Sequence, residues 1–191
     1  MKDRISQQKR NSALSAYTEN PGDVNFAAQE PGEEVLLLLR RHPITNLPWL
    51  LVLLFLILFP FALVLILENT LFENVFIPVR VRILLSILWY LFCCGYALLS
   101  FLSWFFNIYL VTDRKIVDLD YFGLLFFRVS ETELSQIQDV TYSVSGAAHT
   151  LFNYGDIYVQ TAAEAREFDF IAVPRPAQVH DLITDLAQLY D

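Results

Sequence analysis

The residue types that could perform catalysis or bind a metal ion are few and widely spaced in this chain. Its histidines, His42, His149 and His180, are far apart in sequence, and its cysteines, Cys93 and Cys94, are neighbours within an apolar run. The chain has no glycine-rich phosphate loop, HExxH zinc motif, nucleophile elbow or CxxC motif. We therefore expect no catalytic, cofactor-binding or metal-binding site, and no small-molecule substrate.

Basic residues, which could bind a phosphate group, are outnumbered by acidic residues in the C-terminal part of the chain. From residue 111 to 191 there are 5 basic and 13 acidic residues, a balance of −8. An acidic surface repels anionic lipid leaflets and nucleic acid, so we expect no nucleic-acid partner. Arg114 and Lys115, predicted on a hairpin beside the membrane, are the candidates for contact with a lipid headgroup. They serve equally as topology anchors, and that is the interpretation we favour.

Two long apolar runs determine where these residues must sit. Residues 47–67 form 21 positions without a charge, and residues 83–110 form 28. Because about 20 such residues cross a hydrocarbon core, we predict transmembrane helices at 47–67 and 83–106, joined by an extracytoplasmic loop at 68–82.

The distribution of basic residues predicts the orientation of these helices. Six basic residues precede the first helix, two lie in the loop, and two follow the second helix. The positive-inside rule then places both termini in the cytoplasm, as in a multi-pass membrane protein. We expect the following residues at the membrane interface: Arg40, Arg41, Trp104, Tyr109, Arg114 and Lys115.

Small residues recur along the second apolar run at spacings of seven, four and three. They are Ser86, Cys93, Ala97 and Ser100. Small side chains allow helices to approach closely, so we expect this face to contact the first helix or another copy of the protein.

The flanking segments differ in pattern. Residues 1–32 are polar and aperiodic, which predicts a disordered cytoplasmic tail. Residues 33–46 contain a short apolar run that fits either a strand or the start of an interfacial helix.

Residues 107–191 alternate in the manner of antiparallel strands. Val117, Leu119 and Tyr121 fall on one face of a strand, with Asp118 and Asp120 on the other. Turns are predicted at "TDRK" and "DYFG", further strands at 123–129, 137–144, 156–161 and 167–173, and a loop at "SGAAHTLFNYG". A helical period follows "VPRP". The predicted fold is an α+β membrane protein: a two-helix transmembrane hairpin, then a small antiparallel β-barrel capped by the C-terminal helix.

Four segments carry a resemblance to a known family. They are "YLVTDRKIV" at 109–117, "LSQIQDV" at 134–140, "LFNYGDIYVQT" at 151–161 and "VPRP" at 173–176, preceded by "GEEVLLLLRRHP". In this order they resemble the bacterial pleckstrin-homology (PH)-like membrane protein family, in which two transmembrane helices precede a bacterial PH domain. The resemblance implies a PH fold facing the cytoplasm and implies no enzymatic activity.

The expected function is that of a non-catalytic integral membrane protein. Its PH-like domain would act as a protein-interaction or self-assembly module, with the lipid bilayer and another copy or another membrane protein as partners. The short connection between the second helix and the sheet favours a rigid subunit. The alternatives are a lipid-headgroup sensor that uses Arg114 and Lys115, and an accessory subunit of a membrane enzyme or transporter.

Overall fold

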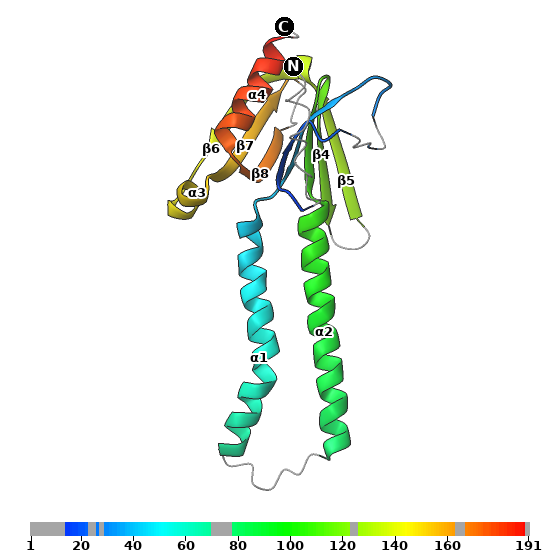
Figure 1. Ribbon diagram of the computed structural model, residues 1–191, viewed down its shortest axis with the longest axis vertical. Coiled ribbons are helices and arrows are strands. Elements are labelled where there is room, and N and C mark those ends of the chain that lie inside the picture. The colour runs from blue at the N-terminus through cyan, green and yellow to red at the C-terminus, as the bar shows by residue number, and fades with distance from the viewer. Residues whose placement is uncertain are drawn as a thin grey trace, which may run out of the picture. The chain divides into compact units, whose positions relative to one another are not determined.

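The computed structural model describes residues 14–22, 26, 29–69, 78–122, 126–162 and 167–189. The chain divides into two compact units (Figure 1). The first, which we call the β-unit, comprises Met1–Pro43 and Trp104–Asp191, and the second, the helical hairpin, comprises Ile44–Ser103.

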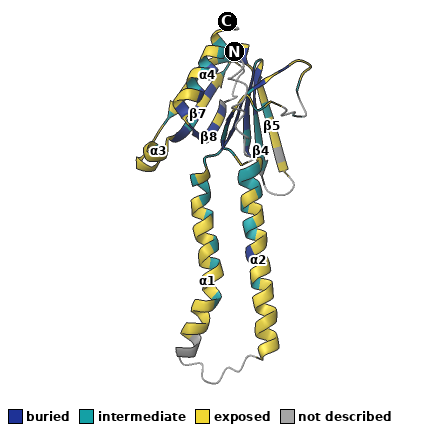
Figure 2. Cartoon of the chain, viewed as in Figure 1, coloured by how far each residue is buried: buried dark blue, intermediate teal, exposed yellow. Residues whose placement is uncertain are grey.

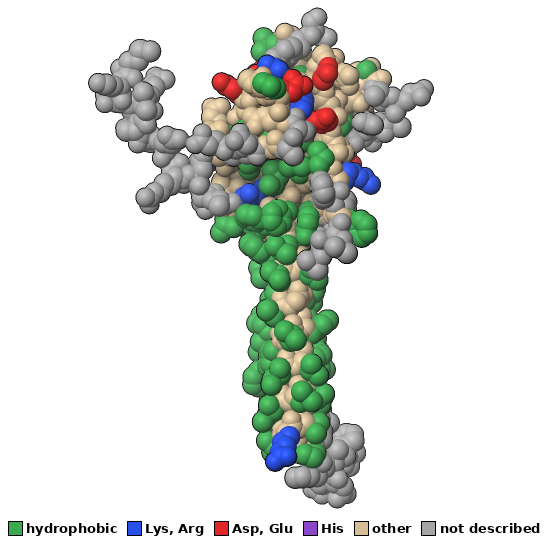
Figure 3. Space-filling view, turned by 90° about the vertical axis from the view of Figure 1, so that its right-hand side faces the viewer, with side chains coloured by type: hydrophobic (Ala, Val, Ile, Leu, Met, Phe, Trp, Pro, Cys, Tyr) green, Lys and Arg blue, Asp and Glu red, His purple; other side chains and the backbone are tan. Residues whose placement is uncertain are grey.

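The helical hairpin consists of α1 (Leu47–Asn69) and the greater part of α2 (Val79–Phe106), with a short 3-10 turn, η1 (Pro43–Asn46), before α1. Both helices are apolar around their whole circumference, and most of their side chains are exposed (Figure 2). Hydrophobic side chains cover nearly all of the visible length of the hairpin (Figure 3). Pro43–Ile66 and Val79–Phe106 are long and apolar enough to cross a membrane. Most of the predicted loop lies outside the described residues.

The larger sheet of the β-unit has five antiparallel strands in the order β1-β2-β3-β4-β5. These are β1 (Tyr17–Glu19), β2 (Val35–Arg40), β3 (Ile108–Thr112), β4 (Lys115–Phe122) and β5 (Phe126–Glu133). The segment at 33–46 thus contains a strand, β2. The prediction of disorder for residues 1–32 is wrong at β1, which pairs with β2 in the register Tyr17 to Leu39. A three-residue strand has too short a pattern to stand out in sequence.

The smaller sheet has the order β6-β7-β8, and α4 packs on β6 and β7 (Figure 1). Its elements are β6 (Ile137–Ser143), α3 (Ala147–Phe152), β7 (Tyr154–Thr161), β8 (Glu167–Pro174) and α4 (Pro176–Gln188), and η2 (Leu134–Gln136) leads into it from β5. The antiparallel sheets and the C-terminal helix match the predicted α+β fold. The closed barrel does not: the described strands form two separate sheets with no hydrogen-bonded pairing between them.

Two apolar clusters hold the β-unit together, because strands at the centre of the five-stranded sheet are buried on both faces. The main core joins both sheets and α4; it contains Leu37, Leu39, Tyr109, Val111, Ile116, Leu134, Ile157, Val159, Phe168, Phe170, Val173, Val179 and Ile183. The second cluster lies on the opposite face of the larger sheet and contains Val35, Leu38, Leu110 and Val117. Alternation along the strands separates the two clusters, and the register irregularity between Val35 and Leu37 puts Val35 on the side of Leu38.

Two local predictions need correction. The strand β4 continues to Phe122, so the first three residues of "DYFG" are strand, and Gly123 lies outside the described residues. The predicted loop before β7 contains the short helix α3, whose Asn153 C-cap adopts a left-handed conformation with φ of 52°. Gly155 follows it, and a Cβ there would lie 2.5 Å from the carbonyl oxygen of Ser143, so glycine is required for this close approach.

Candidate functional site

The hairpin between β3 and β4 holds Arg114 and Lys115 in a tight turn. The Thr112 hydroxyl accepts hydrogen bonds from the backbone N–H groups of Arg114 at 3.2 Å and Lys115 at 2.9 Å, and donates to the carbonyl oxygen of Lys115 at 2.9 Å. Thr112 is fully buried. The "TDRK" turn was therefore predicted correctly, and the threonine explains why the turn is rigid.

Lys115 is buried among carboxylates of its own chain. Its Nζ lies 3.0 Å from Oε2 of Glu131 and 3.9 Å from Oε2 of Glu33, and it also lies over the ring of Phe26 at 5.7 Å. Glu33 has a fully buried side chain, and its Oε2 accepts a hydrogen bond from the backbone N–H of Glu30 at 2.8 Å. Because the Lys115 ammonium is already paired with these carboxylates, it is poorly placed to bind an external phosphate.

Arg114 is paired in the same way. Its Nη1 lies 2.9 Å from Oε2 of Glu30, and its Nε lies 4.0 Å from Oδ2 of Asp113. Two cations therefore stand among four carboxylates, those of Glu30, Glu33, Asp113 and Glu131. We call these six residues the hairpin charge cluster. Its charge sum is −2, which repels a phosphate instead of attracting it.

The hairpin charge cluster is far from the end of α2. The strand β3 separates it from Phe106 by five residues, or about 16 Å of extended chain. The structure thus does not bring Arg114 and Lys115 together with Trp104, with which sequence reasoning grouped them at the membrane interface.

Arg40, Arg41 and Trp104, in contrast, lie together where the chain leaves the β-unit and returns to it. The indole N–H of Trp104 donates to the carbonyl oxygen of Arg41 at 2.9 Å, and the guanidinium of Arg40 lies 4.5 Å from the ring centroid of Phe105. The antiparallel pairing of β2 with β3, in which Arg40 is opposite Ile108, causes this approach. We call Arg40, Arg41, Trp104 and Phe105 the juxtahelical collar.

Tyr109 is buried in the β-unit, although its side chain also forms a hydrogen bond with Arg41 of this collar, and its predicted place at the membrane interface stays a prediction. Its side chain is 1% exposed and stacks on Phe170 with ring centroids 4.6 Å apart, while its hydroxyl accepts the backbone N–H of Ile171 at 3.2 Å. Alternation along β3 directs Tyr109 to the same side as Val111, into the main core.

Asp118 is a partly buried carboxyl that sequence reasoning assigned to the polar face. It is opposite Tyr109 in the β3–β4 register, so it lies on the main-core side of the sheet. Burial, and to a smaller extent the carboxylate of Asp120, raise the pKa of Asp118 to about 7, against an opposing effect of Arg41. The alternation of β4 was predicted correctly, but which face meets the core depends on its partner strands.

Comparison with known proteins gave one family. The model described as "Bacterial PH domain" matches residues 43–187, which include α1, α2, all strands from β3 to β8 and most of α4. The chain belongs to the bacterial PH domain family. No curated protein and no solved structure matched it.

In this bacterial PH domain protein, an aromatic residue that the sequence analysis did not single out connects the two helices of the hairpin. The indole N–H of Trp89 on α2 donates to the carbonyl oxygen of Leu56 on α1 at 2.9 Å, and its ring stacks on Phe59 at 5.4 Å. Of the predicted small-residue face, Cys93 is buried, Ala97 and Ser100 are partly buried, and Ser86 is exposed.

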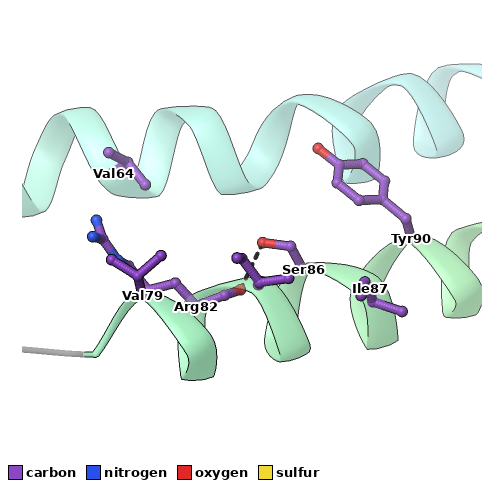
Figure 4. A pocket seen from close by; sticks show the side chains of 7 residues that line it. Val64, Val79, Arg82, Ser86, Ile87 and Tyr90 are labelled. Atoms are coloured by element: carbon purple, nitrogen blue, oxygen red, sulfur yellow. Dashed lines mark hydrogen bonds between the residues drawn. The ribbon is translucent and has the colours of Figure 1, made fainter.

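Near the loop end of the hairpin, α1 and α2 border an open groove of about 620 Å³ (Figure 4). Val64 lines it from α1, and Arg82, Ser86 and Tyr90 line it from α2; the Arg82 and Tyr90 side chains extend toward α1. The Ser86 hydroxyl is used within its own helix, donating to the carbonyl oxygen of Arg82 at 2.9 Å. The groove is lined mostly by apolar side chains.

Among the described residues, no group of three or more His, Cys, Asp or Glu side chains is arranged to bind a metal ion. His42 and His149 both pack on the ring of Tyr154, with centroids 5.0 Å and 4.2 Å away, and His180 contacts Asp181 at 2.9 Å.

Proposed function

We propose that this bacterial PH domain protein is a non-catalytic, membrane-anchored subunit whose β-unit binds another protein or a second copy of itself. The observation that carries the proposal is the hairpin charge cluster, in which both cations suited to a lipid headgroup are already paired with carboxylates. A module of this family binds lipid or protein. Because Arg114 and Lys115 are paired with carboxylates, we favour protein as the partner.

The strand β5 offers the surface for such a partner. In the part of the chain that the structure describes, β5 is an edge strand paired only with β4. Its side chains are largely exposed, with Phe126 at 72% and Val129 also exposed. An edge of eight residues can accept a further strand from a partner through main-chain hydrogen bonds.

Association is tested on the full chain in native-membrane particles, with Cys93→Ser and Cys94→Ser as background. Val129→Cys should form crosslinked dimers or crosslinks to a co-purifying protein with a short thiol reagent. Leu189→Cys, at the C-terminal end of α4 and away from β5 in sequence, is the exposed control and should remain uncrosslinked. A monomeric mass with no co-purifying protein and no crosslink at Val129→Cys would contradict the proposal.

The lipid-sensor alternative has its own test. With Glu30 and Glu131 intact, the β-unit should bind vesicles that contain phosphatidylglycerol no more tightly than vesicles of phosphatidylcholine. Strong binding to the anionic vesicles that Arg114→Ala and Lys115→Ala abolish would favour the headgroup sensor over the protein-binding module.

Anchoring in the inner membrane with both termini in the cytoplasm is part of the proposal. It rests on the apolar circumference of α1 and α2 and on the basic residues that flank them. Asn74→Cys, which lies outside the described residues, should react with an impermeant maleimide on intact cells. Gln160→Cys, exposed on β7, should react only after lysis, and the reverse pattern would place the β-unit outside the cell.

A further inference from the structure

The segment around α3 is the longest uncharged stretch of an otherwise acidic β-unit. Residues 140–155 contain no Asp, Glu, Lys or Arg, and Asp139 and Asp156 border them. An anionic leaflet repels most of this unit, so an uncharged segment is where the unit can approach a lipid surface most closely.

This segment presents apolar side chains to the solvent. Leu151 is 79% exposed, and Phe152 and Val144 are also exposed. They are held there by a rigid local structure: Gly146 has φ of 106° at the N-cap of α3, and Asn153 ends the helix with its carbonyl oxygen accepting the backbone N–H of Arg175 at 2.9 Å. Exposed apolar side chains on a rigid element indicate a contact surface.

The same segment is fixed next to the point where the chain leaves the β-unit. The ring of His42 stacks on Tyr154 with centroids 5.0 Å apart and lies 6.5 Å from the ring of Phe152. His149 of α3 packs on Tyr154 at 4.2 Å. All of these residues belong to the β-unit, and the residue after His42 is the first of the candidate span Pro43–Ile66. Phe152 therefore lies close to the end of the β-unit segment that leads into Pro43.

From this placement we propose that the segment around α3 is a second membrane contact, in which Val144, Leu151 and Phe152 insert into the lipid interface near Pro43, where the chain leaves the β-unit. The inference rests on the proposed membrane anchoring. Its partner is the lipid surface, since an apolar segment lying in the interface buries its side chains at the boundary of headgroups and acyl chains. Together with the span it would prevent the β-unit from rotating about the helix.

Spin labels on the full chain in vesicles of phosphatidylethanolamine and phosphatidylglycerol test this, again with Cys93→Ser and Cys94→Ser. A label at Leu151→Cys should relax with oxygen and be protected from a water-soluble nickel chelate, at a depth of about 5–10 Å. Leu189→Cys, which replaces a side chain of matched exposure at 77%, should show the reverse. Because Leu151 is so exposed, its replacement leaves the fold intact.

A label at Leu58→Cys in α1 separates the two proposals. Nickel protection at Leu58 with free nickel access at Leu151 would overturn the α3 contact and leave the anchoring intact. Nickel access at Leu58 would overturn the anchoring itself. Protection of Leu151 from both reagents, with dipolar broadening between labels, would show a second copy on this surface and overturn the lipid contact.

Discussion

The main core and the helical hairpin treat the same kinds of side chain in opposite ways. Phe170 in the main core is fully buried, whereas Phe61 in α1 is 62% exposed. Strands of the β-unit alternate, so each can give one apolar face to the core. The helices α1 and α2 are apolar all round, and two helices can bury only a stripe each against one another.

The difference teaches that apolar content does not determine burial; the arrangement of apolar residues does. In the hairpin, the stripe that is covered includes Trp89 and Cys93, and most of the remaining apolar surface faces outward. Such a surface is stable only in apolar surroundings, as the proposed membrane anchoring supplies. Three predictions test or sharpen this comparison.

The largest effect is expected from removing β1 and β2 from the β-unit. A fragment of residues 107–191 lacks Leu37 and Leu39 of the main core, and each lost leucine side chain costs about 2–5 kcal/mol. Against a total stability of about 5–15 kcal/mol, this fragment should not fold. Near-ultraviolet circular dichroism and urea unfolding measure the outcome.

A joined fragment is the matched control for this truncation. Residues 14–43 linked to 104–191 by a short Gly-Ser segment should fold without the hairpin, because the Trp104 indole nitrogen lies only 2.9 Å from the Arg41 carbonyl oxygen. Equal cooperative unfolding of both fragments would show that the β-unit does not depend on β1 and β2.

The second effect compares one phenylalanine from each unit. Phe170→Ala should destabilise the full chain by about 3–5 kcal/mol, since it removes a buried ring that stacks on Tyr109. Phe61→Ala should change stability by no more than about 0.5 kcal/mol, as expected for an exposed side chain. Thermal unfolding in detergent measures both. Equal losses would mean that α1 is buried as tightly as the core.

The smallest effect concerns Asp118, a partly buried carboxyl of the β-unit. The folded pKa of Asp118 is about 7, above its ordinary value of 3.8, so the folded state binds the proton more tightly and stability falls as pH rises from about 4 to 7. Asp118→Asn should remove this loss and raise stability at pH 8 by about 1–2 kcal/mol, after solvent screening of a partly exposed group.

The pH dependence of urea unfolding checks this prediction, with Asp139→Asn as an exposed carboxyl control. The wild-type chain should become more stable as the pH is lowered from 8 to 5, and the Asp118→Asn chain should show a flatter profile. An unchanged profile in Asp118→Asn would show that another group causes the dependence.

The sequence by itself determined the two apolar helices, the strand periodicity after residue 107 and the C-terminal helix. It also identified the "TDRK" turn. Each of these depends on a local pattern: a long run without charge, an alternation of period two, a helical stripe, or a residue that a tight conformation requires. Local patterns can be recognised without knowing which distant segment lies against them.

Only the tertiary structure decided which strands pair and which face of each strand is covered. The strand β2 pairs with β3, which lies beyond the helical hairpin in sequence, and this places Tyr109 in the main core and Asp118 on the same side of the sheet. Arg114 meets Glu30 across 84 residues, so its charge is neutralised by a partner that no local pattern predicts. Burial and ion pairing depend on contacts between distant parts of the chain, and these are set when the sheets assemble.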